Sequence, residues 1–427
     1  MMRRTLLLAY SLSPGFAKLS GIDAFFGIGL VVLVIYAALL PKPITKSGST
    51  TTIVRIVMFA FVAYGLLLGL ALWLADLANI RAYLIGTLTF LMPLLAVAAA
   101  GPERSAALLQ DVPAVAIVHA VLALAIYPTF SPDISLLKQT GEILLEGTFA
   151  FRLSSVSGSL AFSTLMTVAF AVSLQHYTSS ERGSMKSRVA WSSALLFLCC
   201  GFLSLQRAAW IALALAWLIA LLFAEPRRRG SIFLLLAAAI APAAVALMFV
   251  DIPQDAVDII FDRFATLAGA GEIGVVAERA DQWLNALYNL RELPTGHGPG
   301  QIGQPVRETG PLTGGLPVYD GDYFRIISEY GAFGIAMVLL IAVGTLRSAF
   351  KSILLNGCQQ MASHAILSVA LLGITLQGIG TNVTELYFAN TLFWALWMQS
   401  WQSSRIRPAE TYSRLPRSTH VTGAPAE

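Results

Sequence analysis

The sequence predicts an all-α polytopic membrane protein with about twelve transmembrane helices and one long polar loop between the ninth and the tenth. Three observations support this fold class. Of the 427 residues, 56% are hydrophobic and only 12% are charged, whereas a soluble domain is roughly half apolar and a quarter charged. Apolar runs near the ~20 residues that cross a bilayer as a helix recur along the chain. A single polar stretch, residues 251–322, interrupts them.

Eleven of these apolar runs are long enough, or nearly so, to span a bilayer as helices. A twelfth, residues 5–16, is short and contains Pro14 and Gly15. We interpret it as a retained first helix, because no convincing small-x-small cleavage site follows it. The eleven runs are residues 22–40, 53–76, 80–100, 112–127, 157–174, 189–204, 208–223, 231–250, 323–343, 364–379 and 384–401.

The runs divide the chain into four parts. Residues 1–250 are predicted to form a membrane domain of helices 1–9, and residues 323–402 a membrane domain of helices 10–12. Between them, residues 251–322 form the long loop, which includes an amphipathic helix. Residues 403–427 are rich in Ser, Arg, Pro and Thr without apolar periodicity, which predicts a disordered tail.

Most of the 28 basic residues fall on one side of the twelve-helix arrangement, and the run Arg227, Arg228 and Arg229 directly after a span is its strongest anchor. The positive-inside rule makes this side cytoplasmic, together with both termini, and sends the long loop outside. Several arginines nevertheless lie on the outer side, and two explanations remain open. In the first, these arginines are solvated loop charges or extend toward lipid headgroups. In the second, their planar guanidinium groups bind a phosphate-bearing ligand.

The long loop carries three patterns in a fixed order. From Glu278 the residues read as an amphipathic helix that stops before Pro294. A glycine-rich turn follows, Gly296-His-Gly298-Pro-Gly300. The chain then re-enters the membrane through residues 318–334, where Asp320 and Asp322 precede an apolar run.

In this order the motifs resemble the superfamily of O-antigen polymerases and O-antigen ligases, which handle polyprenyl-diphosphate-linked glycans. Four elements carry the resemblance, which covers roughly residues 152–334. They are Arg152 before a serine and glycine patch, the turn of residues 204–210 with Arg207, Arg279 together with the glycine-rich turn, and residues 320–334. The proline-asparagine pair often seen after the first arginine is absent after Arg152.

One departure bears on the branch of the family. Aligning Glu329-Tyr-Gly331 with the family's glutamate-x-glycine motif puts Asp320 and Gly321 where ligases typically carry histidine and asparagine. The resemblance therefore favours a polymerase. His297 is the only histidine on the outer face, and between two glycines we read it as a turn residue more readily than as a catalytic group.

The resemblance implies an enzyme of the bacterial inner membrane that polymerises undecaprenyl-diphosphate-linked oligosaccharide repeats at the periplasmic face by glycosyl transfer. The product would be O-antigen, capsular polysaccharide or exopolysaccharide. No zinc spacing, nucleotide fingerprint or phosphate-binding glycine-lysine motif appears in the sequence, and the scattered carboxylates of the loop form no convincing metal site, so we expect no metal, no cofactor and no nucleic acid. A chain-length regulator and a flippase of the same pathway are expected as further partners. The candidate catalytic residues are Asp320, Asp322, Arg279 and Arg207; the candidate substrate-binding residues are Arg152, Arg325, Glu329 and His297.

Alternatives stay open at this point. An O-antigen ligase would transfer the glycan to lipid A-core, and a lipid-linked glycan flippase or transporter would move it without a new bond. Charges clustered at helix ends and not at mid-membrane disfavour transport. Asp320 and Asp322 could instead interact with the dipole of the helix they precede, and Glu329 could hold an arginine instead of touching substrate.

Overall fold

The computed structural model describes most of the apolar part of the chain. The described residues are 2–20, 24–40, 49–126, 144–145, 148–149, 153, 155, 158–204, 206–249, 281, 284, 288, 294–303, 321–354 and 358–401. Arg152, Arg279 and Asp320 lie outside them.

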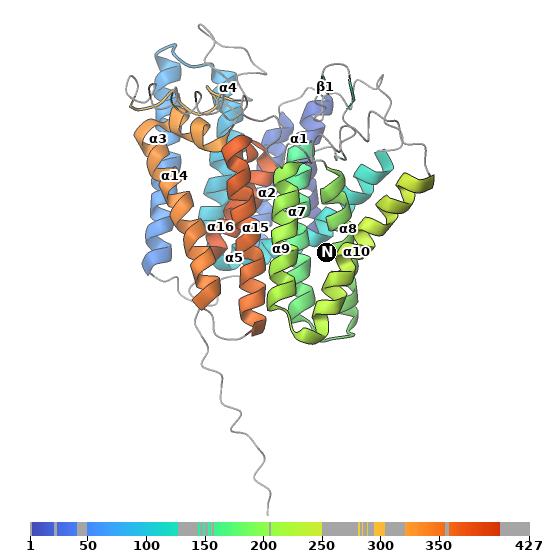
Figure 1. Cartoon of the computed structure of the whole chain (residues 1–427). Helices are drawn as coiled ribbons and strands as arrows, with labels where there is room; N and C mark the ends of the chain where they lie inside the picture. Colours follow the sequence, from blue (N-terminus) through green and yellow to red (C-terminus); the bar gives the residue numbers. More distant parts are fainter. Residues whose placement is uncertain are drawn as a thin grey trace, which may run out of the picture.

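The described chain is a bundle of helices with one two-residue antiparallel strand pair (Figure 1). The elements, in order, are α1 (Met2–Ser20), α2 (Ala24–Leu39), α3 (Ser49–Leu74), α4 (Ile80–Gly86), the π-helix η1 (Thr87–Leu91), α5 (Met92–Ile126), β1 (Leu144–Leu145), β2 (Thr148–Phe149), α7 (Ser159–Ser179), α8 (Met185–Leu203), α9 (Arg207–Phe223), α10 (Pro226–Phe249), α14 (Asp322–Leu354), α15 (Cys358–Gly380), the 3₁₀ turn η3 (Val383–Glu385) and α16 (Tyr387–Ser400).

The prediction of an all-α polytopic membrane protein is confirmed. Within the described residues, five helical segments are long and apolar enough to cross a membrane, and two shorter apolar helices accompany them. The count of about twelve helices and the four-part division of the chain stay predictions. The long segments are Ser49–Leu74, Ile80–Ala125, Leu160–Ser179, Asp322–Lys351 and Ala362–Gly380.

The core of the bundle is α16, which buries thirteen of its fourteen residues. A helix that is apolar on all sides has to be surrounded by other helices, and α5, α7, α14 and α15 pack around it. The edge of the bundle is α3, whose apolar residues are mostly exposed. Small residues allow the closest approaches: a Cβ on Gly373 of α15 would lie 2.3 Å from the Cβ of Ala212 in α9.

Residues 102–111, which the sequence suggested as a connection between two spans, are helical. Helix α5 continues through them, with a break at Gly101, where φ is 75° and ψ is 178°. Arg55 of α3 donates to the carbonyl oxygens of Ala98 (2.7 Å) and Ala99 (3.1 Å), which the break leaves without their helical partners. A helix break at Gly101, with Arg55 bonded to its carbonyl groups, therefore stands where a connecting loop was expected.

The two ends of the bundle carry different residues. We call the end where α14 begins and α8 ends the re-entry end, and the end where α16 stops the Trp401 end. At the Trp401 end Thr51 donates to the carbonyl oxygen of Trp401 (2.9 Å), and Arg347 covers the ring of Trp401. The sequence predicts that this end faces the cytoplasm.

Candidate functional site

The re-entry helix α14 is interrupted two turns after it begins. Gly331 has φ 59° and ψ −134°, so the helix changes direction there (Figure 1). The break leaves backbone groups of neighbouring residues without helical partners, and groups that leave solvent need new ones. The glycine-rich turn supplies them.

Three backbone hydrogen bonds join the glycine-rich turn to the break in α14. The amide of His297 donates to the carbonyl oxygen of Ser328 (3.0 Å) and the amide of Gly298 to that of Glu329 (2.9 Å). In return, the amide of Ala332 donates to the carbonyl oxygen of Pro294 (2.9 Å). Two motifs some thirty residues apart in sequence therefore form one structural unit.

Backbone contacts this close explain why the motifs are rich in glycine. A Cβ on Gly331 would lie 2.0 Å from the carbonyl oxygen of Pro294, and one on Gly296 would lie 2.4 Å from the carbonyl oxygen of Glu329. Gly300 has φ 73°, and its Cβ would lie 2.0 Å from the carbonyl oxygen of Ala82 in α4. Any side chain at these positions would separate the two backbones.

The same turn packs against the outer helices of the bundle. Tyr64 of α3 donates to the carbonyl oxygen of Thr295 (2.5 Å), and its ring stacks on Phe333 at 4.2 Å. Gln301 exchanges two hydrogen bonds with the backbone of Asn79, at 3.0 and 3.1 Å. The part of the long loop over 294–303 is therefore docked on helices and is not a free solvent loop.

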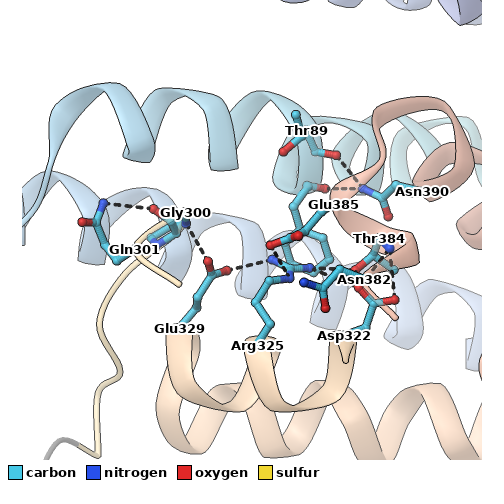
Figure 2. Close-up of polar contacts among 12 residues, drawn as sticks. Thr89, Gly300, Gln301, Asp322, Arg325, Glu329, Asn382, Thr384, Glu385 and Asn390 are labelled. Carbon is cyan, nitrogen blue, oxygen red and sulfur yellow. Dashed lines mark hydrogen bonds and ion pairs between the residues drawn. The ribbon is translucent and has the colours of Figure 1, made fainter. Parts of the chain in front are cut away.

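Beside this turn, one guanidinium group faces three carboxylates (Figure 2). Arg325 contacts Glu329 at 2.8 Å, Glu385 at 3.4 Å and Asp322 at 3.7 Å, and its Nη2 donates to the hydroxyl of Thr384 (2.7 Å). The four charged residues are at most 7% exposed. We call them the Arg325 cluster. With every group ionised it carries a formal charge of −2, so removal of its cation would leave uncompensated buried charge.

The Arg325 cluster ties together three separate segments. Asp322 accepts from the amide (2.9 Å) and the hydroxyl (2.6 Å) of Thr384 in the turn between α15 and α16. Glu329 accepts from the amide of Gly300 (2.8 Å). The re-entry helix is thereby fixed to the glycine-rich turn on one side and to the turn between α15 and α16 on the other.

The turn of residues 382–385 also lies beside Gly303 and Gly321, the two described residues that flank 304–320. On one side, a Cβ on Gly303 would lie 1.9 Å from Oε1 of Glu385. On the other, the amide of Gly321 donates to the side chain of Asn382 (2.8 Å). Asp320, itself outside the described residues, adjoins this second anchor.

Arg207 begins α9 at the same end of the bundle. Helix α9 lies against α15 with Ala212 beside Gly373, and five residues further along α15 a Cβ on Gly378 would lie 3.2 Å from Oδ2 of Asp322. Helices α9 and α15 run antiparallel. Arg207, five residues before Ala212 in α9, is therefore displaced from Ala212 toward the level of Gly378 and Asp322. The amide of Leu153 donates to the carbonyl oxygen of Leu203 (2.9 Å), so the residue that follows Arg152 lies beside the Arg207 turn.

The structure thus brings the five described candidates, Arg207, His297, Asp322, Arg325 and Glu329, to one end of the bundle. The ion pair offered as the alternative role of Glu329 is present. Burial lowers the pKa of His297, so its imidazole is neutral at pH 7 and adds no positive charge for an anionic substrate. The positions of Arg152, Arg279 and Asp320 lie outside the described residues.

Sequence reasoning did not select Asn382, Thr384 and Glu385, which complete the site. A signal was available, because Asn382 lies between two apolar runs and Thr384 and Glu385 are polar residues at the start of the second run. Of the predicted amphipathic helix, the three described positions, Asp281, Leu284 and Tyr288, are helical and exposed. Across the described residues no group of three or more His, Cys, Asp or Glu side chains is placed to hold a metal ion.

Most of the site lies within a segment that matches a known family. Residues 192–339 match the model of the family described as O-antigen ligase, and this range includes the Arg207 turn, the glycine-rich turn and the break in α14. No curated protein matches the chain significantly. Through residues 192–339 the chain is therefore similar to the superfamily of O-antigen polymerases and ligases.

Proposed function

We propose that the protein polymerises polyprenyl-diphosphate-linked oligosaccharide repeats at the periplasmic end of the bundle. The family implies a glycosyl-transferring membrane enzyme with a lipid-linked oligosaccharide substrate. The observation that carries the finer proposal is the convergence of the glycine-rich turn, the re-entry helix and the Arg207 turn at one end. The sequence predicts that this end faces away from the cytoplasm.

In the proposed reaction a sugar hydroxyl of one lipid-linked repeat attacks the anomeric carbon of a glycan on a second lipid diphosphate. A new glycosidic bond forms, the bond between the anomeric carbon and the diphosphate oxygen breaks, and the lipid diphosphate leaves. The hydroxyl proton passes to a base. Cations held in place at the leaving diphosphate stabilise the transition state more than the ground state, which is the role we assign to Arg207, Arg279 and then Arg152.

Two aspartates were candidates for the base, and their surroundings separate them. Asp322 is 2% exposed and is already bonded to Thr384 and Arg325, so we assign it a positioning role with Arg325 and Glu329. Asp320 precedes the anchored Gly321 and is our proposed base, which would need to come within about 3 Å of the acceptor hydroxyl. We propose that neither a metal nor a cofactor takes part.

A ligase is the second candidate, because the matching family is described by that activity. Asp320 and Gly321 stand where ligases of the family typically carry histidine and asparagine, which favours the polymerase. A transporter of lipid-linked glycan would need no glycosyl transfer at all. The three activities can be distinguished with one substrate. Polymerisation and ligation form different products, and transport forms no new bond.

The test uses full-length protein in proteoliposomes with an undecaprenyl-diphosphate-linked repeat unit. We expect a ladder of products that differ by one repeat. Asp320→Asn should give no ladder at normal protein abundance, while Asp281→Asn, at an exposed acid of the same loop, should keep it. Transfer only to added lipid A-core would make the protein a ligase, and translocation without a new bond would make it a transporter.

The arginine assignment predicts a defect from a charge-conserving change. A charge-assisted hydrogen bond contributes about 1.5 to 3 kcal/mol, so Arg207→Lys should slow chain extension by about one to two orders of magnitude. Arg279→Lys should do the same. Initial rates of ladder formation per folded protein measure this, with Arg188→Lys on the exposed surface of α8 as the control. Wild-type rates in both variants would exclude the diphosphate role.

A further inference from the structure

A fully buried histidine lies inside the bundle near the re-entry end, and the reaction proposed above does not use it. His119 of α5 is 0% exposed. Its ring is nearly parallel to that of Phe388, with 6.5 Å between the ring centroids. Phe388 follows Glu385 of the Arg325 cluster by three residues. The imidazole therefore lies at the level of the first turn of α16.

Each ring nitrogen of His119 has a serine partner. Nε2 lies 2.8 Å from Oγ of Ser11 in α1, and Nδ1 lies 2.8 Å from Oγ of Ser155. Ser11 and Ser155 are 0% and 2% exposed. Inside a protein such a chain of hydrogen bonds is strong, because its members cannot exchange their partners for water. The histidine thus joins α1 to the segment that precedes α7.

The hydroxyl of Ser11 decides which nitrogen carries the proton. It donates its one hydrogen to the carbonyl oxygen of Leu8 (2.7 Å), so it accepts from Nε2–H of His119. In the neutral imidazole Nδ1 is then an acceptor, and the hydroxyl of Ser155 donates to it. The two hydrogen bonds of the ring therefore have opposite directions.

The segment that His119 holds is also bonded to the end of α8, directly before the Arg207 turn. The amide of Leu153 donates to the carbonyl oxygen of Leu203 (2.9 Å), the last residue of α8. The carbonyl oxygen of Ser155 accepts from the amide of Gly158 (3.0 Å), the residue before α7. These contacts fix the described residues of the segment to α5, to α8 and to the start of α7.

We propose that His119 is a positioning residue for glycosyl transfer, because through Ser155 it holds the segment that Arg152 adjoins. Arg152 is joined to Leu153 by one planar peptide bond, so the reach of its guanidinium group starts from an anchored residue. The inference rests on the proposed role of Arg152 at the leaving diphosphate. A cation that is not held in place stabilises the transition state less.

Two substitutions of His119 separate its two hydrogen bonds. The side-chain oxygen of asparagine takes the place of Nδ1, so His119→Asn keeps an acceptor for Ser155. The side-chain nitrogen of glutamine takes the place of Nε2, so His119→Gln keeps a donor for Ser11 and loses the contact to Ser155. A role in packing alone would not favour the asparagine variant.

The first measurement is amide hydrogen exchange of residues 153–158 in the full-length protein in detergent. Exchange should be about fivefold faster in His119→Gln, the usual effect of losing one hydrogen bond, and close to wild type in His119→Asn. Ser155→Ala removes the same bond from the other side and decides the matter if His119→Gln does not fold. His176→Gln, in the last turn of α7, is the control and should change nothing. Unaltered exchange in His119→Gln and Ser155→Ala would overturn the inference.

The second measurement is the initial rate of glycosyl transfer per folded protein. His119→Gln should slow transfer about fivefold, and His119→Asn should stay near wild type. In protein that already carries Arg152→Ala, the same His119→Gln change should cost less than about twofold, because no cation is left to position. An equal loss in both backgrounds would show that His119 does not act through Arg152. Faster exchange in His119→Gln, combined with no transfer by the wild type, would instead refute the proposed function and leave the anchoring of residues 153–158 in place.

Discussion

Arg325→Met is expected to destabilise the folded protein by about 3 to 5 kcal/mol, the usual result of removing one partner of a buried ion pair. Three carboxylates would then stand together with no cation, at positions no more than 7% exposed. Methionine keeps much of the volume, so lost packing contributes little. Thermal unfolding of the full-length protein in detergent and its abundance in membranes measure the effect.

Two further variants separate charge from shape at Arg325. Arg325→Lys restores the charge but not the simultaneous contacts to Glu329, Glu385 and Thr384, so its stability should be intermediate. Adding Glu329→Gln to Arg325→Met removes one of the stranded carboxylates and should recover part of the loss. Arg188→Met, at an exposed arginine of α8, should have little effect. Wild-type stability of Arg325→Met would show that the cluster does not hold the re-entry helix.

The sequence predicted the parts of the site better than their assembly. Glycine-rich turns, an acidic re-entry and a glutamate-x-glycine motif are visible in the chain, and each lies where the helix pattern places it. Composition and hydropathy report how a segment partitions into a membrane. They do not report which turns meet, so nothing in the pattern joins Gly300 to Glu329 or Gly331 to Pro294.

Glu385 is a second residue whose contact could not be predicted from the sequence pattern. It begins an apolar run and looks like a polar residue at a helix end, yet it is 7% exposed and contacts Arg325, sixty residues earlier in the chain. Such a pair becomes visible only after α14, α15 and α16 are packed. Gly101 is comparable, because a break capped by Arg55 of another helix replaces a loop that composition alone suggested.

Gly331→Ala is expected to abolish most of the enzyme's activity while leaving the helix bundle intact. The added Cβ would lie 2.0 Å from the carbonyl oxygen of Pro294, so the glycine-rich turn would have to leave the break in α14. Its three backbone hydrogen bonds to the break, each contributing about 1 kcal/mol, would be lost with it. Displacement of site elements by about 1 Å costs on the order of 100-fold in rate, so chain extension should fall at least that far.

Gly183→Ala is the control for an alanine placed at a positive φ without a steric clash. Gly183 has φ 76°, close to the φ of 59° at Gly331, and nothing lies within 4 Å of its added Cβ. Alanine is disfavoured at both positive-φ positions, but only in Gly331→Ala does the added Cβ also meet the backbone of the glycine-rich turn. Ladder formation per folded protein should therefore fall in Gly331→Ala and in Gly300→Ala, whose Cβ meets Ala82, and stay near wild type in Gly183→Ala. Equal activity of Gly331→Ala and Gly183→Ala would mean that docking of the turn on the re-entry helix is not needed for catalysis.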